Sequence, residues 1–163
     1  MLRTWSHPPR DGRLGTERRT LGVVIDALVH GYQRTLFDSI ARTARDRGVN
    51  CIVFTGGRLP SPVYDLVDEK NIDALIVVGS TIAHQVGPIG VTDFCKRFAH
   101  FPMCSIGIEI EGIPSVTITG ASGIRALVTH LMSDHGRRNL AFIKGLGADG
   151  VERFEAFRAC LNE

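Results

Sequence analysis

Short apolar runs alternate with amphipathic stretches along most of this chain. Four of the runs are nearly continuous and rich in β-branched residues, as buried parallel strands are; they cover residues 21–26, 50–55, 73–79 and 102–107. A shorter run at 115–119 predicts a fifth strand. Because strands that alternate with helices form parallel βαβ units, the pattern predicts an α/β fold with a doubly wound parallel sheet.

The stretches between the runs place apolar residues at helical spacing. Gly31 begins a predicted helix that ends near Gly48, and Ser61 with Pro62 begins a short one that reaches residue 70. Residues 80–90 are rich in glycine and proline and are predicted to form a loop, followed by a helix over 91–98.

Residues 113–161 predict a second, smaller group of elements. Ser122 is expected to cap a helix that runs to Asp134, and Gly136 to stop that helix. The apolar run 140–143 predicts a buried strand, and a last helix extends from Asp149.

These elements carry the residues of a family resemblance. The segments IPSV at 113–116, HGRRNLAFIKG at 135–145, NIDALIVVGS at 71–80 and the helix with Arg153 and Phe157 together resemble the lactose/purine-repressor family. The resemblance implies a type I periplasmic-binding-protein fold, in which a small ligand lies between two lobes. It divides the chain into a disordered basic tail (1–20), a first α/β lobe (21–118), and a hinge with part of a second lobe (119–163).

Charge and composition narrow the choice of partner. The net charge of +2 divides into +3 over the first twenty residues and about −1 over the rest, so the folded part is not expected to bind nucleic acid. No apolar run approaches the length of about 20 residues that a membrane helix needs, and a cytoplasmic protein is expected. Four scattered cysteines without zinc-site spacing favour reduced core thiols.

Ligands of parallel sheets bind at the carboxyl ends of the strands, and these ends supply the candidate ligand-binding residues. They are Asp26, Thr55, Ser80 and Thr119, together with His30 and Tyr32 from the loop after the first strand. The resemblance implies that Tyr32 stacks on the ligand and that Arg153 pairs with its polar groups. Thr119 stands where the family usually has an acid. Simpler roles stay open: local packing for Tyr32, a solvated charge for Arg153 and a helix cap for Asp26.

Two further patterns suggest other chemistry. Residues 145–150 match G-x-G-x-x-G, a dinucleotide-binding pattern when it joins a strand to a helix, although Asp149 would repel the phosphates. His130 and His135 are five residues apart, which is not the spacing of paired metal ligands on one helix. Neither a metal, a cofactor nor a catalytic nucleophile is expected.

The resemblance therefore implies a small-molecule-sensing regulatory domain that acts by lobe closure, and not an enzyme. The expected ligand is a sugar or a nucleobase-like metabolite, and the expected assembly is a homodimer. Family members without a DNA-binding head are fused to signalling modules, which gives the domain a role in signal transduction or transcription regulation. One alternative is a ligand-free dimerisation module, favoured by the missing acid at Thr119. A second is a fragment of a nucleotide-binding oxidoreductase.

Overall fold

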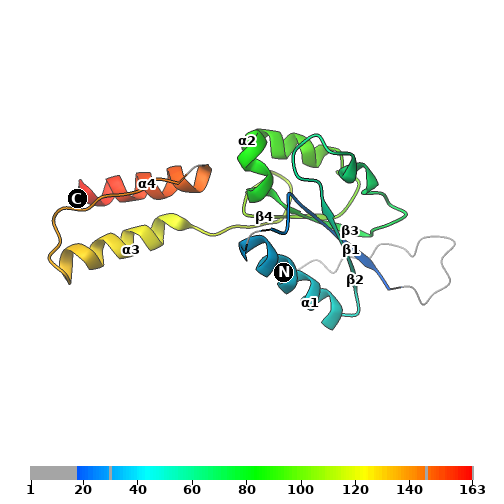
Figure 1. Cartoon of the computed structure of the whole chain (residues 1–163), viewed down its shortest axis with the longest axis horizontal. Coiled ribbons are helices and arrows are strands. Elements are labelled where there is room, and N and C mark those ends of the chain that lie inside the picture. Colours follow the sequence, from blue (N-terminus) through cyan, green and yellow to red (C-terminus); the bar gives the residue numbers. More distant parts are fainter. Residues whose placement is uncertain (1–17, 30, 146, 163) are drawn as a thin grey trace.

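The computed structural model describes residues 18–29, 31–145 and 147–162, and its centre is a parallel sheet. The five strands lie in the order β2-β1-β3-β4-β5, and every neighbouring pair is parallel (Figure 1). Their bounds are Thr20–Ile25 (β1), Asn50–Thr55 (β2), Ala74–Val78 (β3), Met103–Ile106 (β4) and Ser115–Val116 (β5). The predicted α/β fold with a parallel sheet is confirmed.

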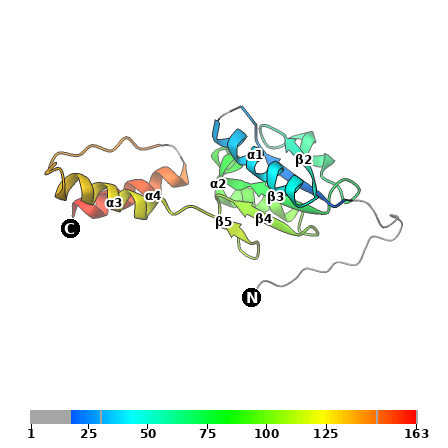
Figure 2. The ribbon, with the colours of Figure 1, turned by 90° about the horizontal axis from the view of Figure 1, so that it is seen from below.

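Helices cover both faces of this sheet (Figures 1 and 2). Helix α1 (Gly31–Asp46) packs on one face, where Leu36 and Ile40 lie against the buried Val23 and Ile25 of β1. The other face is covered by α2 (Gly79–Lys96) and by the 3₁₀-helix η1 (Pro62–Leu66). Their buried side chains form one cluster with β3, which places the larger part of the core on this face. We call residues 18–118 the sheet unit.

The segment 80–90 is helical, so the predicted loop is wrong. Helix α2 begins at Gly79, directly after β3, because Thr81 and Ile82 are buried against the sheet and hold this first part in place. Gly87 interrupts the helix with a φ of 70°, and Pro88 follows at the start of the second part. Proline lacks the N–H that a first turn leaves unused, so the glycine-proline pair kinks this helix and does not end it.

Residues after β5 form a pair of packed helices, α3 (Gly120–Ser133) and α4 (Ala148–Leu161). We call them the α3–α4 pair. Val128 of α3 and Phe157 and Cys160 of α4 are buried between them. Helix α3 begins two residues before the predicted cap: Ser122 lies inside it, and Thr119 takes the N-cap position without a side-chain hydrogen bond to the helix.

The predicted strand at 140–143 is absent, since the structure shows no strand between α3 and α4 in the described residues. The segment is extended, and its side chains alternate as in a strand. Leu140 and Phe142 pack on the helix pair, whereas Ile143 is 97% exposed. A strand is held by backbone hydrogen bonds to a neighbouring strand, and none of the described strands lies beside this segment. The continuous apolar run therefore predicted a buried strand wrongly in two respects: the segment has no pairing strand among the described residues, and Ile143 is exposed.

The described cysteines are free thiols, and Cys95 and Cys160 are buried. Burial raises the pKa of the Cys95 thiol to about 11, so this group is uncharged at neutral pH and is a poor nucleophile. Among the described residues, no helix combines the length and the apolar character needed to cross a membrane.

Candidate functional site

A hydrogen-bonded polar pair at the carboxyl edge of the sheet joins Asp26 to Gln33. Asp26 follows β1, and its Oδ1 accepts a hydrogen bond of 2.8 Å from Gln33 Nε2 in α1. Gln33 is only 6% exposed, so the amide that holds the carboxylate is itself fixed by the core. A carboxylate accepts several hydrogen bonds, and Asp26 is half-buried at the edge where ligands of such sheets bind.

Tyr64 of η1 packs against the residues at this edge of the sheet. Its side chain is fully buried, and its hydroxyl donates to the Ile25 carbonyl at 3.1 Å. A Cβ on Gly56 would lie 2.3 Å from the Tyr64 ring, so only glycine lets the loop after β2 lie on that ring. Burial raises the pKa of Tyr64, and the charge of Asp26 adds to this, while a hydrogen bond with the Gly56 backbone opposes it. The phenol therefore stays protonated and keeps its structural bond.

Three more hydrogen bonds fix the loop after β2. Gly57 donates its N–H to the Asp26 carbonyl at 2.8 Å. The side-chain amide of Gln85 in α2 makes two hydrogen bonds to the loop. Its Nε2 donates to the Gly57 carbonyl at 3.0 Å, and its Oε1 accepts from Leu59 N–H at 3.1 Å. The loop that carries Thr55 is thus tied to both β1 and α2.

Ser80 lies at the end of β3 but is turned into the protein. Its hydroxyl is buried without a hydrogen-bond partner among the described residues. A Cβ on Gly107, whose φ is 83°, would lie 2.4 Å from this hydroxyl, so the Gly107 backbone covers it directly. A buried hydroxyl without a partner costs about 1–3 kcal/mol.

We expect the substitution Ser80→Ala to raise the free energy of unfolding by about 1 kcal/mol, because it removes an unpaired buried hydroxyl. Ser105→Ala is the matched control, since the Ser105 hydroxyl donates to the Ile108 carbonyl at 2.7 Å and its loss should cost about 1–2 kcal/mol. Urea unfolding of both variants measures the two changes. A loss of stability in Ser80→Ala would show that its hydroxyl has a stabilising partner.

The other predicted ligand-binding residues are spread around the same edge and the linker. Tyr32, at the start of α1, is 54% exposed, and Thr55 and Thr119 are also exposed. Arg153 is exposed on α4 and lies over Gly120, where an added Cβ would be 2.9 Å from its Cγ and Nε. His30 lies outside the described residues. In both ribbon views the carboxyl ends of the strands and the start of α1 lie on the side nearest the α3–α4 pair (Figures 1 and 2). That Tyr32 and Arg153 face one cleft stays a prediction.

Sequence reasoning missed Gln33, Gln85 and His84. Gln33 lies only seven residues after Asp26, and a polar residue on the inner face of an amphipathic helix was the available signal. Gln85 and His84 were hidden by the wrong loop prediction. The His84 ring lies 3.1 Å from the position of a Cβ on Gly147, so α2 meets the start of α4 here. Glu152 of α4 also accepts a hydrogen bond of 3.3 Å from Ala121 N–H of α3.

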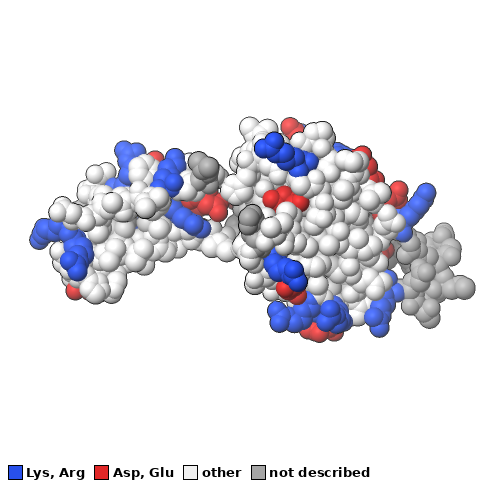
Figure 3. Space-filling view, in the orientation of Figure 1, with Lys and Arg blue, Asp and Glu red and all other residues white. Residues whose placement is uncertain are grey.

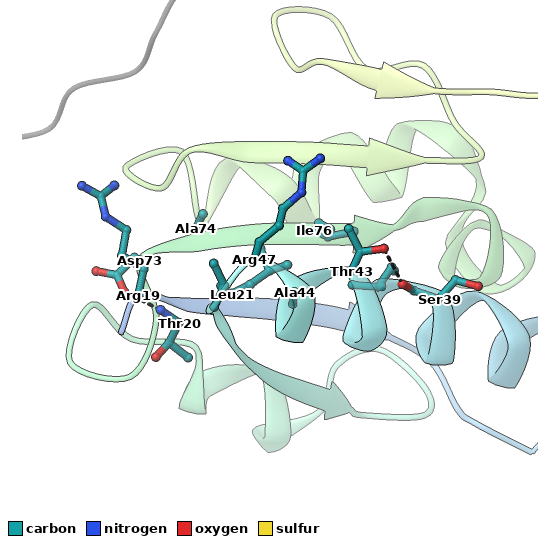
Figure 4. A pocket seen from close by; sticks show the side chains of 12 residues that line it. Arg19, Thr20, Leu21, Ser39, Thr43, Ala44, Arg47, Asp73, Ala74 and Ile76 are labelled. Carbon is teal, nitrogen blue, oxygen red and sulfur yellow. Dashed lines mark hydrogen bonds between the residues drawn. The ribbon is translucent and has the colours of Figure 1, made fainter. Parts of the chain in front are cut away.

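A separate groove of about 510 Å³ lies at the opposite, amino edge of the sheet, between α1 and strands β1 and β3 (Figure 4). Leu21, Ile40, Ala44 and Ile76 give it a mostly apolar wall. Two residues of its lining are hydrogen-bonded to each other, since Thr20 N–H donates to Asp73 Oδ2 at 2.7 Å. This groove offers few polar groups to a sugar and lies away from the predicted ligand residues.

Within the residues that it describes, the structure lacks the element that a dinucleotide site at residues 145–150 would need in front of its glycines. No strand precedes the glycines of residues 145–150 in the described part of the chain, so the strand–loop–helix unit is missing. A Cβ on Gly150 would lie 2.1 Å from the Gly145 carbonyl oxygen. The absence of a Cβ on Gly150 therefore permits close packing of the Gly145 backbone on the start of α4.

Comparison with solved structures defines the fold. The trehalose repressor from Escherichia coli has a TM-score of 0.71 at 19% identity, over 88% of this chain and 55% of that one. A probable LacI-family transcriptional regulator from Corynebacterium glutamicum gives 0.69 at 21% identity, over 87% and 55%. A sugar-binding LacI-family regulator from Escherichia coli, complexed with phosphate, gives 0.67 at 18% identity, over 88% and 52%.

This chain therefore has the fold of the ligand-binding domain of LacI-family regulators, the type I periplasmic-binding-protein fold, as the sequence predicted. It spans about half the length of these solved structures. No protein-family model matches the chain, and no curated protein does.

Proposed function

We propose that this chain is a small-molecule-sensing regulatory domain, not an enzyme, and that its ligand binds at the carboxyl edge of the sheet unit. The observation that carries the proposal is the Asp26–Gln33 pair at the edge where ligands of parallel sheets bind. The names of the structural neighbours, a trehalose repressor and a sugar-binding regulator, support a sugar or a similar polar metabolite as the ligand class.

The proposed mechanism is closure of the α3–α4 pair toward the sheet unit. Residues 117–119 connect the two as a single linker without helix or strand. Arg153 lies over Gly120, directly after this linker. A ligand that contacts both Asp26 and Arg153 would bind the closed arrangement more tightly than the open one. This difference in affinity shifts the conformational equilibrium, which is the signal passed to a transcriptional or signalling module.

The surface charge supports a small ligand over nucleic acid. Figure 3 shows Lys and Arg interspersed with Asp and Glu on the drawn face of the sheet unit, with a broad uncharged area between them. Binding to nucleic acid draws on a clustered basic surface. A homodimer in the cytoplasm, as expected from the sequence, remains part of this proposal.

A panel of sugars and nucleobases, each at about 10 mM, tests the ligand class through the melting temperature of the chain. A ligand that binds only the folded state stabilises it by RT ln(1 + [L]/Kd), or about 1.4 kcal/mol at ten times Kd. We expect a shift with a sugar that is lost in Asp26→Asn and kept in Asp68→Asn, which changes an acid on the loop before β3. Equal shifts in both variants would place the ligand elsewhere.

A second candidate is a ligand-free interaction module, and the exposed end of the sheet favours it. Val116, on the edge strand β5, is 60% exposed, and Ile118 in the linker is 81% exposed. An uncovered apolar edge strand invites pairing with another chain. Sedimentation velocity of wild type and Val116→Lys separates the candidates: a dimer that the lysine abolishes, with no ligand found, would favour the interaction module.

A further inference from the structure

The far end of the α3–α4 pair brings two histidines together. His130 lies in the last turn of α3, and His135 follows two residues after the helix ends at Ser133. His135 lies in the turn that follows the helix, directly before Gly136, whose φ is 60°. The Nε2 atoms of the two rings are 3.0 Å apart, and the rings meet edge to face. The helical-spacing argument against a metal pair does not apply, because His135 is not on the helix.

A carboxylate orients the first of these rings. His130 Nδ1 is 2.6 Å from Asp134 Oδ2; a carboxylate only accepts hydrogen bonds, so Nδ1–H is the donor, and in the neutral ring Nε2 is then the nitrogen without a proton. This is the arrangement that metal-ligating histidines have, in which the second ring nitrogen donates to a carboxylate. Both rings are at the surface, where a hydrated ion has access.

We propose that His130 and His135 form a binding site for a late first-row divalent metal ion, with both Nε2 atoms as ligands. The ion replaces the single proton that the two nitrogens share. In the described residues no group of three or more His, Cys, Asp or Glu is placed to hold a metal, so water fills the other positions. The proposal does not rest on the sensor function.

The distance between the nitrogens is compatible with one ion bound by both rings. Imidazole makes metal bonds of about 2.0–2.1 Å, so two Nε2 atoms about 3 Å apart reach neighbouring positions around one metal after small rotations of the rings. Nitrogen ligands bind Ni²⁺ and Cu²⁺ more tightly than the earlier first-row divalent ions, and both ions accept water in their remaining positions. Ni²⁺ is therefore a suitable probe of the site.

The charges around the site are mixed. Asp134 supplies a negative charge next to His130, and the carbonyl end of α3 adds a partial one. Arg125 lines the same surface depression as His130 and Asp134, one turn and a half back along α3, and Arg137 and Arg138 follow in the turn. The positive side chains are long and exposed, so they can move away from a bound cation.

Isothermal titration of the full chain with NiCl₂ near neutral pH tests the proposal. We expect one site whose affinity falls at least tenfold in His135→Ala and by 10–100-fold in Asp134→Asn, which removes the carboxylate that orients His130. The matched control is His100→Ala, which removes an exposed histidine beside Phe101 and should leave the affinity unchanged.

The location of the ion is read independently from amide NMR spectra. Substoichiometric Ni²⁺ should broaden the signals of residues 129–136 in the wild type and leave them sharp in His135→Ala. No titratable heat with wild type, or equal affinity in wild type and His135→Ala, would overturn the proposal. So would broadening that is centred on another histidine.

Discussion

Replacing Tyr64 by alanine is expected to lower the free energy of unfolding by about 3–5 kcal/mol, the usual cost of truncating a buried aromatic residue. The Tyr64 ring is fully buried and packs edge-on against Phe94, with ring centroids 5.2 Å apart. Its removal leaves a cavity under the loop after β2, which carries Gly56 and Gly57 at the carboxyl edge. Equilibrium unfolding in urea measures the loss.

Tyr64→Phe separates the packing of the ring from the hydrogen bond of its hydroxyl. It keeps the ring but removes the donor to the Ile25 carbonyl, so we expect a loss of about 1–2 kcal/mol. If the two variants lost equal stability, the ring would contribute nothing beyond its hydroxyl, and the account of this edge would be wrong.

Gly107→Ala is expected to cost about 2–5 kcal/mol, from two separate causes. The φ of 83° at this position disfavours any residue with a Cβ, at about 1–2 kcal/mol. The added Cβ would also lie 2.4 Å from the Ser80 hydroxyl and 3.5 Å from its backbone Cα, and such crowding costs about 1–3 kcal/mol. Thermal or urea unfolding gives the total.

Gly112→Ala provides the matched control for the backbone part. Its φ of 77° is similar, but nothing lies within 4 Å of an added Cβ. We expect this variant to lose only the conformational part, and the double variant Ser80→Gly with Gly107→Ala to recover most of the crowding part. Equal losses in Gly107→Ala and Gly112→Ala would mean that Ser80 has room to move.

The strands of the sheet unit could be predicted because each is a short, mostly apolar run bounded by polar or turn residues. The segments 80–90 and 140–143 could not, for opposite reasons. Glycine and proline in the first suggest a loop, yet burial of Ile82 holds a kinked helix against β3. The second has a strand's pattern, but a strand also needs a hydrogen-bonding neighbour, which a single-sequence pattern does not reveal.

The sequence could predict which residues lie at the strand ends of the candidate site. It could not predict which residues they contact. Asp26 could be chosen because the carboxyl end of a buried parallel strand is a general ligand position. Its partner Gln33 depends on how α1 lies on the sheet, and the inward turn of Ser80 depends on the path of Gly107. Both are tertiary contacts. The pairing of His130 with His135 likewise depends on where α3 ends, since His135 lies in the turn after the helix.

The most direct test of the sensor proposal is an amide NMR titration of the full chain with the sugar that gives the largest melting shift. The account predicts shifts at residues 26–33, 55–58 and 79–81. It also predicts weak binding, because one wall of the proposed cleft is the small α3–α4 pair. Shifts confined to the apolar groove around Leu21, Ile40 and Ile76, or no shifts with any sugar at about 50 mM, would contradict it.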